Sequence, residues 1–261
     1  MNRRFDQKAF FERLARYEKH VRDAALGKLD DLHPYIKDCY YYGEADNKPF
    51  QYAVICIPGR GNDGADFAMD YFEQSGLKNT VFVGPTPKKR EWYPMPYNAK
   101  NQKEAVAGLP FARSVIQEII QNTTESFNIA HRNIVLAGFS AGGVMAINTA
   151  VHSAKTLMGV VCHAGAILDT KDVPDAQVAT PMLLMHNRDD MCFEWFERYL
   201  PMKKTLISAG YHLYVSEKQK GGHFVADSDV SHAGSFIRSE THYKAKNSKQ
   251  KRDSSQYREV F

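Results

Sequence analysis

The sequence of 261 residues has few long apolar runs and no segment typical of membrane insertion. No run approaches the roughly 18 apolar residues that span a bilayer. The opening segment MNRRFDQKAF also lacks the apolar core of a secretory signal. These absences argue against membrane-spanning and secreted classes, and we expect a cytoplasmic protein.

Cysteine is scarce, and no CxxC spacing suggests a metal site. Three of the four cysteines lie in or beside apolar runs, which predicts buried free thiols. The four are Cys39, Cys56, Cys162 and Cys192.

Most of the chain also lacks an excess of positive or negative charge. The net charge is +4, but residues 241–261 alone hold six Lys or Arg against two acidic residues. The rest of the chain is therefore formally neutral, which argues against a nucleic-acid-binding face in the fold. We expect the basic segment to be a solvated tail.

What is present indicates one large α/β domain with two appendages. The hydrophobic fraction of 43% and the charged fraction of 25% are ordinary for a globular chain. Apolar residues spaced by three and four predict an amphipathic helix from Phe5 to Leu29. We therefore divide the chain into a helical extension (1–30), a domain (31–240) and the tail (241–261).

The two appendages leave the question of partners open. The predicted helix either packs on its own domain or binds a membrane surface or another protein. The basic tail is a second candidate for membrane contact, and a homodimer is a further hypothesis.

Apolar segments rich in Val and Ile alternate with helical patterns through the predicted domain. The segments YIKDCYYYGE and QYAVICIP read as strands, and the turn chemistry of residues 46–49 predicts an antiparallel hairpin between them. Alternation predicts a mostly parallel sheet with helices on both faces. The predicted strands are 53–57, 80–83, 133–137, 157–162, 182–185 and 212–215, and the predicted helices 64–75, 110–127, 141–153, 193–209 and 229–240.

One long connection, residues 85–108, interrupts this alternation. Four aromatic or sulfur side chains, Trp92, Tyr93, Met95 and Tyr97, occupy its middle. They form either an apolar wall over a substrate pocket or a cluster folded against the loop's own core.

The segment GFSAGG at 138–143 is the strongest chemical signal. It follows a predicted strand and opens a predicted helix, which is the context in which G-x-S-x-G exposes a serine on a sharp turn. Gly138 and Gly142 are needed because side chains would collide in so tight a turn. Ser140 is therefore the candidate nucleophile, and an inert Gly-rich turn is the alternative.

A serine nucleophile needs a histidine base oriented by a carboxylate. In this fold the partners follow in the order Ser, Asp or Glu, His at later strand ends. Asp189 and Asp190 both follow the strand 182–185, and His223 lies in a Gly-rich loop after the last strand. His223 is the candidate base, and either aspartate fits the acid.

Two backbone N–H groups are expected to hold an oxyanion. One belongs to Ala141, which follows the nucleophile. The loop IPGRGN after an early strand supplies the other, and we assign it to the Arg60 amide. The Arg60 guanidinium itself is expected to be a surface group or an ion-pair partner.

Taken together, these segments resemble the α/β-hydrolase superfamily, and within it the phospholipase/carboxylesterase family that includes acyl-protein thioesterases, with dienelactone hydrolases nearby. IPGRGNDGADF at 57–67 resembles the family's LHGxGxxxxDF, GFSAGG its GFSQGG, and WYP at 92–94 its substrate-loop motif. HNRDDMCF at 186–193 resembles HGxxDxxVP, and that alignment places the acid on Asp190, with Asp189 as the alternative. Pro58 and Asn187 depart from the family pattern without removing a catalytic group.

The resemblance implies an α/β-hydrolase fold and hydrolysis of small-molecule carboxylic esters or thioesters without metal or cofactor. It adds Gly59, Trp92, Tyr93 and Met191 as candidate substrate-binding residues. A noncatalytic binding protein on the same fold is the rival hypothesis.

Overall fold

The computed structural model describes most of the chain. The described residues are 19, 22–30, 32–44, 49–94, 102–246 and 258–259, with side chains described up to residue 241. Among them, no helix is both long enough and apolar enough to cross a membrane.

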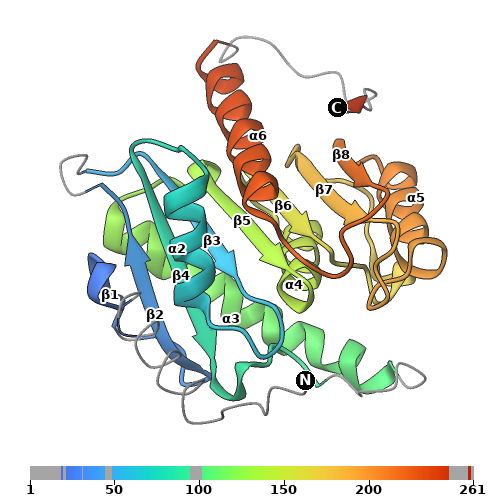
Figure 1. The fold of residues 1–261 in the computed structure, drawn as a ribbon, viewed down its shortest axis with the longest axis horizontal. Helices are drawn as coiled ribbons and strands as arrows, with labels where there is room; N and C mark the ends of the chain where they lie inside the picture. Colours follow the sequence, from blue (N-terminus) through green and yellow to red (C-terminus); the bar gives the residue numbers. More distant parts are fainter. Residues whose placement is uncertain are drawn as a thin grey trace, which may run out of the picture.

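A nine-stranded sheet forms the centre of the fold, in the order β1-β2-β4-β3-β5-β6-β7-β8-β9 (Figure 1). From β4 through β9 all neighbouring strands run parallel, while β1 and β2 are antiparallel to their neighbours. The strands are β1 (Gly27–Lys28), β2 (Ile36–Tyr42), β3 (Tyr52–Ile57), β4 (Thr80–Pro87), β5 (Ile134–Phe139), β6 (Gly159–His163), β7 (Met182–Asn187), β8 (Leu213–Lys218) and β9 (Arg258–Glu259).

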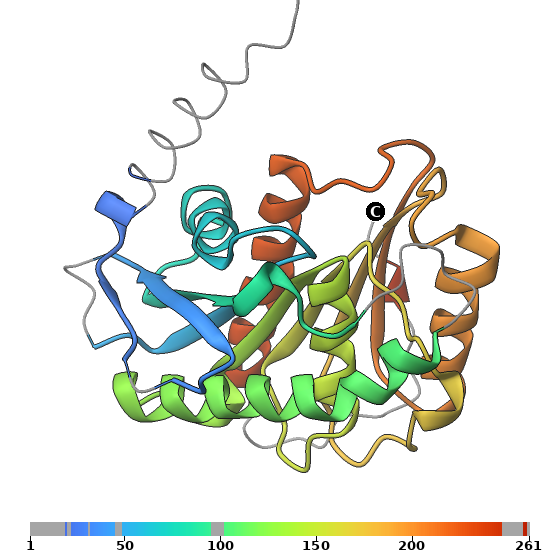
Figure 2. The same ribbon diagram turned by 90° about the horizontal axis from the view of Figure 1, so that it is seen from below.

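Helices cover both faces of the sheet, as Figure 2 shows edge-on. The helices are α2 (Gly64–Gln74), α3 (Lys103–Phe127), α4 (Ala141–Val151), α5 (Leu200–Ser208) and α6 (Asp227–Lys246). One face packs on α3, α4 and α5, and the other packs on α2 and α6. Alternate residues of β3 illustrate this, because Ile55 joins the first core and Val54 the second. Short helical turns are Lys88–Arg90, His131–Asn133, Thr170–Asp172 and the π-helical Trp195–Tyr199.

The structure confirms the predicted fold class and the predicted alternation of strands and helices. Each predicted strand overlaps an observed one, and each predicted helix from 64 onward has a counterpart. Helix α3 begins at Lys103, seven residues before the expected start, with Pro110 inside it. Three of the thiols, those of Cys39, Cys56 and Cys162, are buried and free as predicted, while Cys192 is exposed.

The predicted hairpin between β2 and β3 is wrong. Strand β4 lies between them, antiparallel to β2 and parallel to β3. The crossover from β3 through α2 returns the chain as a parallel strand beside β3, on the side that a hairpin partner would have taken. Residues 46–48 of the expected turn lie outside the described residues.

The helix predicted for residues 5–29 extends too far, because the chain already forms a strand at residue 27. Gly27 and Lys28 form β1 and pair with β2, and Leu29 is buried in the core. A Cβ at position 27 would lie 2.3 Å from the Tyr41 hydroxyl oxygen, so glycine permits this close approach. The apolar positions that motivated the helix, from Phe10 to Val21, lie outside the described residues.

Residue 241, where the tail was predicted to start, lies within a helix. Helix α6 continues to Lys246, and Arg258–Glu259 pairs with β8 as a short parallel strand. Apolar residues stop at Ile237 within this helix apart from Tyr243 and Ala245, so the sequence pattern fades before the helix ends. The division into three parts stays a prediction.

Candidate active site

Ser140 lies on the sharp turn between β5 and α4. Its backbone has φ 54° and ψ −118°, a strained conformation for a residue with a side chain. The Ser140 N–H donates to the carbonyl of His163 on the adjacent strand β6. The strained turn is thus fixed to the sheet and projects the serine from the carboxyl end of β5.

Two glycines make this turn possible, as the sequence predicted. A Cβ on Gly138 would lie 2.2 Å from the carbonyl oxygen of Gly142. A Cβ on Gly142 would lie 2.0 Å from the carbonyl oxygen of Ile57, at the end of β3. Both distances are far below van der Waals contact, so the turn packs backbone against backbone.

The structure brings Ser140, His223 and Asp190 into one hydrogen-bonded chain. His223 Nε2 lies 2.8 Å from Ser140 Oγ, and His223 Nδ1 lies 2.8 Å from Asp190 Oδ2. The rings of Phe139 and Phe193 lie 5.0 and 6.0 Å from the imidazole. The imidazole therefore lies beside two aromatic side chains, with one nitrogen toward Ser140 and the other toward Asp190.

Asp190 is buried and well supplied with donors. Its Oδ1 accepts hydrogen bonds from the N–H groups of Cys192 and Phe193, at 2.8 and 3.0 Å. Burial by itself raises the pKa of Asp190, but the hydrogen bonds from His223, Phe193 and Cys192 outweigh it and hold the pKa below its ordinary value. Asp190 therefore stays a carboxylate beside His223.

Asp189, the alternative acid, contacts a different part of the same loop. Its carboxylate accepts from the N–H groups of Gly222 and Gly221, at 2.8 and 3.2 Å. The Gly222 hydrogen bond is the main cause of its lowered pKa. Asp189 thus anchors the loop that carries His223, a role that sequence reasoning missed.

The expected oxyanion loop follows β3 and lies beside Ser140. Gly59 is buried under Phe139, and Arg60 is exposed with its guanidinium 2.6 Å from Glu91. This ion pair agrees with the surface role expected for the side chain. Ala141 is the first residue of α4, where backbone N–H groups have no partner within the helix.

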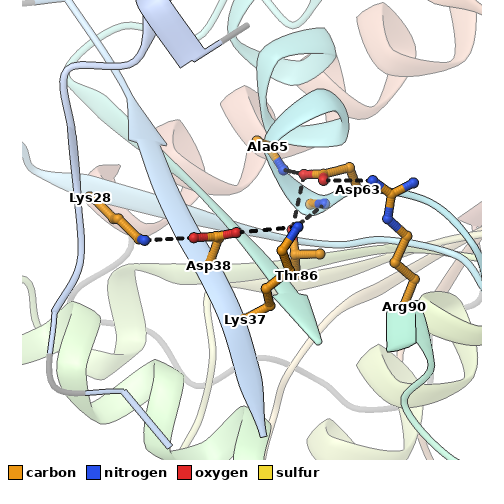
Figure 3. Close-up of polar contacts among 8 residues, drawn as sticks. Lys28, Lys37, Asp38, Asp63, Ala65, Thr86 and Arg90 are labelled. Atoms are coloured by element: carbon orange, nitrogen blue, oxygen red, sulfur yellow. Dashed lines mark hydrogen bonds and ion pairs between the residues drawn. The ribbon is translucent and has the colours of Figure 1, made fainter. Parts of the chain in front are cut away.

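A polar network holds the next part of this loop (Figure 3). Asp63 caps α2 by accepting from the Ala65 N–H, and it also accepts from the Thr86 hydroxyl, both at 3.0 Å. Arg90 lies 3.4 Å from its second oxygen. Asp63 therefore ties the loop to the end of β4. An aspartate before a helical pattern is a capping signal that sequence reasoning had not used.

Figure 3 also shows Asp38 of β2 paired with Lys28 and Lys37. The Lys28 pair, at 2.6 Å, joins β1 to β2.

Trp92 and Tyr93 lie in the hydrophobic core, with 1% and 3% exposure. The Trp92 indole N–H donates to the Pro58 carbonyl at 3.0 Å, directly before Gly59. These positions favour the alternative in which the loop aromatics fold against the core, where they support the oxyanion loop. Met95 and Tyr97 lie outside the described residues.

Two hollows lie beside His223 and Asp190. The first, of about 210 Å³, is lined by residues that include Gly59, Phe67, Asp70, Phe139 and His223. The second is a wider surface cleft of about 520 Å³. Its lining includes Asp190, Met191, Trp195 and Phe196.

A family model and several solved structures match most of this chain. The model of the family described as Phospholipase/Carboxylesterase matches residues 44–240. The crystal structure of esterase PE8 has 23% sequence identity to this chain and a TM-score of 0.66. The match covers 73% of this chain and 93% of the esterase chain.

Two further structures share the fold at lower identity. A phospholipase/carboxylesterase from Dyadobacter fermentans has 17% identity, coverage of 80% and 100%, and a TM-score of 0.65. Acyl-protein thioesterase 2 from Zea mays has 12% identity, coverage of 77% and 98%, and a TM-score of 0.60.

Proposed function

The chain belongs to the phospholipase/carboxylesterase family and is a hydrolase of the esterase type, and we propose that Ser140, His223 and Asp190 are its catalytic triad. The observation that carries this proposal is the continuous hydrogen-bonded chain Ser140 Oγ, His223 and Asp190, with 2.8 Å at both links. The expected substrates are carboxylic esters or thioesters.

In the proposed first step, His223 Nε2 accepts the Ser140 proton as the hydroxyl oxygen attacks the carbonyl carbon. Asp190 keeps the Nδ1 proton in place and stabilises the imidazolium that forms. His223 then protonates the leaving alcohol or thiol, and an acyl-enzyme remains. A water molecule, deprotonated by His223, hydrolyses the acyl-enzyme and frees the acid.

The proposed oxyanion donors are the backbone N–H groups of Arg60 and Ala141. Support comes from their positions, one in the loop after β3 and one at the start of α4, directly after Ser140. The helix dipole of α4 adds positive potential at the same place.

The two hollows suggest where the substrate lies. Aromatic side chains such as Phe67 and Phe139 suit an apolar group in the smaller hollow, while its carboxylates disfavour an anionic one. Burial, together with Asp227 and Glu73, raises the pKa of Asp70 in this hollow to about 6. Met191, exposed at 86%, is the proposed contact in the wider cleft. Activity toward p-nitrophenyl esters and thioesters of increasing acyl length would define the acyl specificity.

A fluorophosphonate probe tests the nucleophile directly. The probe is expected to label the wild-type protein but not Ser140→Ala, because it phosphonylates only a serine activated by a base. Labelled protein is read by gel fluorescence, with circular dichroism as the check that both proteins are folded. Folded wild type that is never labelled would support the rival hypothesis of a noncatalytic binding protein.

A further inference from the structure

An exposed thiol lies next to the proposed acid and base. Cys192 follows Asp190 by two residues, and its Sγ, a carboxylate oxygen of Asp190 and a ring nitrogen of His223 all lie within 4.8 Å of one another. No other three groups of these kinds come so close in the described part of the chain. Thiolate, imidazole and carboxylate are the ligands that zinc prefers.

The three side chains differ in how firmly they are held. The Cys192 N–H and His223 fix opposite oxygens of the buried Asp190 carboxylate. The Cys192 side chain is exposed and is therefore the one that can turn toward a metal ion. Ligand atoms around a tetrahedral zinc ion are roughly 3.3–3.7 Å apart. A rotation of Cys192 and a small widening of the cluster reach that spacing.

The charge around the thiol also favours a cation. The carboxylates of Asp190 and Glu194 both act electrostatically on the Cys192 thiol. Their negative potential attracts a divalent ion. Because a metal ligand must be deprotonated, binding releases the thiol proton to solvent.

We propose that Asp190, Cys192 and His223 form an inhibitory site for a thiophilic divalent cation such as Zn²⁺. This inference rests on the proposed triad, since it explains how the ion would stop hydrolysis. The ion forms bonds to the Cys192 thiolate, the Asp190 carboxylate and one His223 nitrogen, and water fills the fourth position.

Either nitrogen of His223 gives the same result. If Nδ1 binds the ion, the neutral ring carries its proton on Nε2 and cannot accept the Ser140 proton. If Nε2 binds the ion, the lone pair that would accept this proton is already used. In both cases Ser140 has no base, and hydrolysis stops until the ion is removed.

Inhibition is measured with p-nitrophenyl ester hydrolysis at buffered free Zn²⁺, using a phosphine reductant that does not compete as a thiol. Zn²⁺ is expected to inhibit the wild type, and EDTA to restore activity. Cys192→Ser keeps the backbone N–H that binds Asp190, and its inhibition is compared with its own metal-free activity. It should need roughly tenfold more Zn²⁺ for half inhibition. Cys192→His, which restores a zinc ligand, should recover most of the sensitivity.

His152→Asn is the matched control for other metal-binding groups. It removes a second histidine–carboxylate pair, in which His152 Nε2 lies 3.3 Å from Asp172. Its inhibition by Zn²⁺ should equal that of the wild type. Equal inhibition of wild type and Cys192→Ser, or none of the wild type, would overturn the proposal.

Metal binding is measured separately in Ser140→Ala, because this measurement does not require an active enzyme. Co²⁺ should produce a near-ultraviolet thiolate charge-transfer band that disappears in the Ser140→Ala, Cys192→Ser double variant. A Cys192-dependent band, together with folded wild-type protein that fluorophosphonates do not label, would keep the metal site and reject the triad. An active triad without that band would keep the hydrolase and reject the metal site.

Discussion

Two adjacent aspartates, Asp189 and Asp190, have different partners. Asp190 is buried and contacts His223, whereas Asp189 is exposed and binds the N–H groups of Gly221 and Gly222. Both follow β7, and sequence spacing alone left either able to serve as the acid.

Asp190→Asn should lower kcat for p-nitrophenyl ester hydrolysis by about 10³-fold or more, because an amide cannot stabilise the imidazolium or hold its tautomer. Asp189→Asn, the matched control, should cost less than about tenfold, since its one amide oxygen can still accept from the Gly222 N–H. Steady-state kinetics of both variants provide the measurement. A larger loss in Asp189→Asn would mean that the acid is Asp189.

Arg60→Ala separates the arginine side chain from its backbone N–H. The guanidinium pairs with Glu91 where both side chains are about one-third exposed, at 37% and 35%. Removing an exposed pair costs about 1 kcal/mol or less in unfolding free energy. Because the proposed oxyanion donor is the amide, kcat should fall by less than about fivefold. A fall comparable to that of Asp190→Asn would instead show that the guanidinium acts on the substrate.

At the scale of elements, the turn between β5 and α4 depends on close packing against the end of β3. Strand β3 pairs with β5 from Ala53 to Ile57, which brings the Ile57 carbonyl beneath Gly142. The same strand leads into the proposed oxyanion loop. Helix α4, strand β3 and the loop therefore act as one packed unit around Ser140.

Gly142→Ala should disrupt this unit. Its Cβ would lie 2.0 Å from the Ile57 carbonyl oxygen, so the backbone must move, at a cost of about 2 kcal/mol or more in unfolding free energy. Gly143→Ala is the control on the same helix, where the nearest atom is the Cys162 Sγ at 3.0 Å. Urea unfolding and fluorophosphonate labelling should both rank Gly142→Ala as the more damaging change. Equal effects would contradict the close packing of the turn.

At the scale of the whole molecule, the sheet buries titratable groups far from solvent. His163 at the end of β6 is 2% exposed, and its Nε2 lies 2.7 Å from the Tyr71 hydroxyl of α2. Burial lowers the pKa of His163 to about 4. The neutral imidazole shares a hydrogen bond with the Tyr71 hydroxyl and links the sheet to the helix that covers it.

This burial predicts how stability depends on pH. An unfolded histidine binds a proton below pH about 6.5, and folded His163 binds one only below about 4. The unfolded state then binds more protons, so the free energy of unfolding should fall by up to roughly 3 kcal/mol as the pH drops through this window.

Urea unfolding of wild type and His163→Gln at several pH values isolates the effect. Between pH about 6.5 and 4, the free energy of unfolding should decrease less in the variant than in the wild type. Asp70, whose raised pKa of about 6 makes the folded state bind more protons, has the opposite sign. Asp70→Asn should therefore steepen the wild-type decrease. Identical slopes for wild type and His163→Gln would contradict the burial effect.

The sequence by itself determined the features that depend on local order. Period, spacing and turn chemistry within short segments predict the fold class, the strand–turn–helix around Ser140, the two turn glycines and the position of His223 after the strand that became β8. Apolar runs also predicted the buried cysteines correctly.

Only the tertiary structure decided which distant groups meet. The bond between Asp190 and His223 joins residues 33 apart, and the burial of Trp92 beneath Pro58 joins residues 34 apart. Strand assembly likewise decides that β4 lies between β2 and β3. It also brings Cys192 beside His223. Such contacts depend on strand order, register and side-chain packing, whose energies are shared across the whole sheet, so no local pattern in the sequence specifies them.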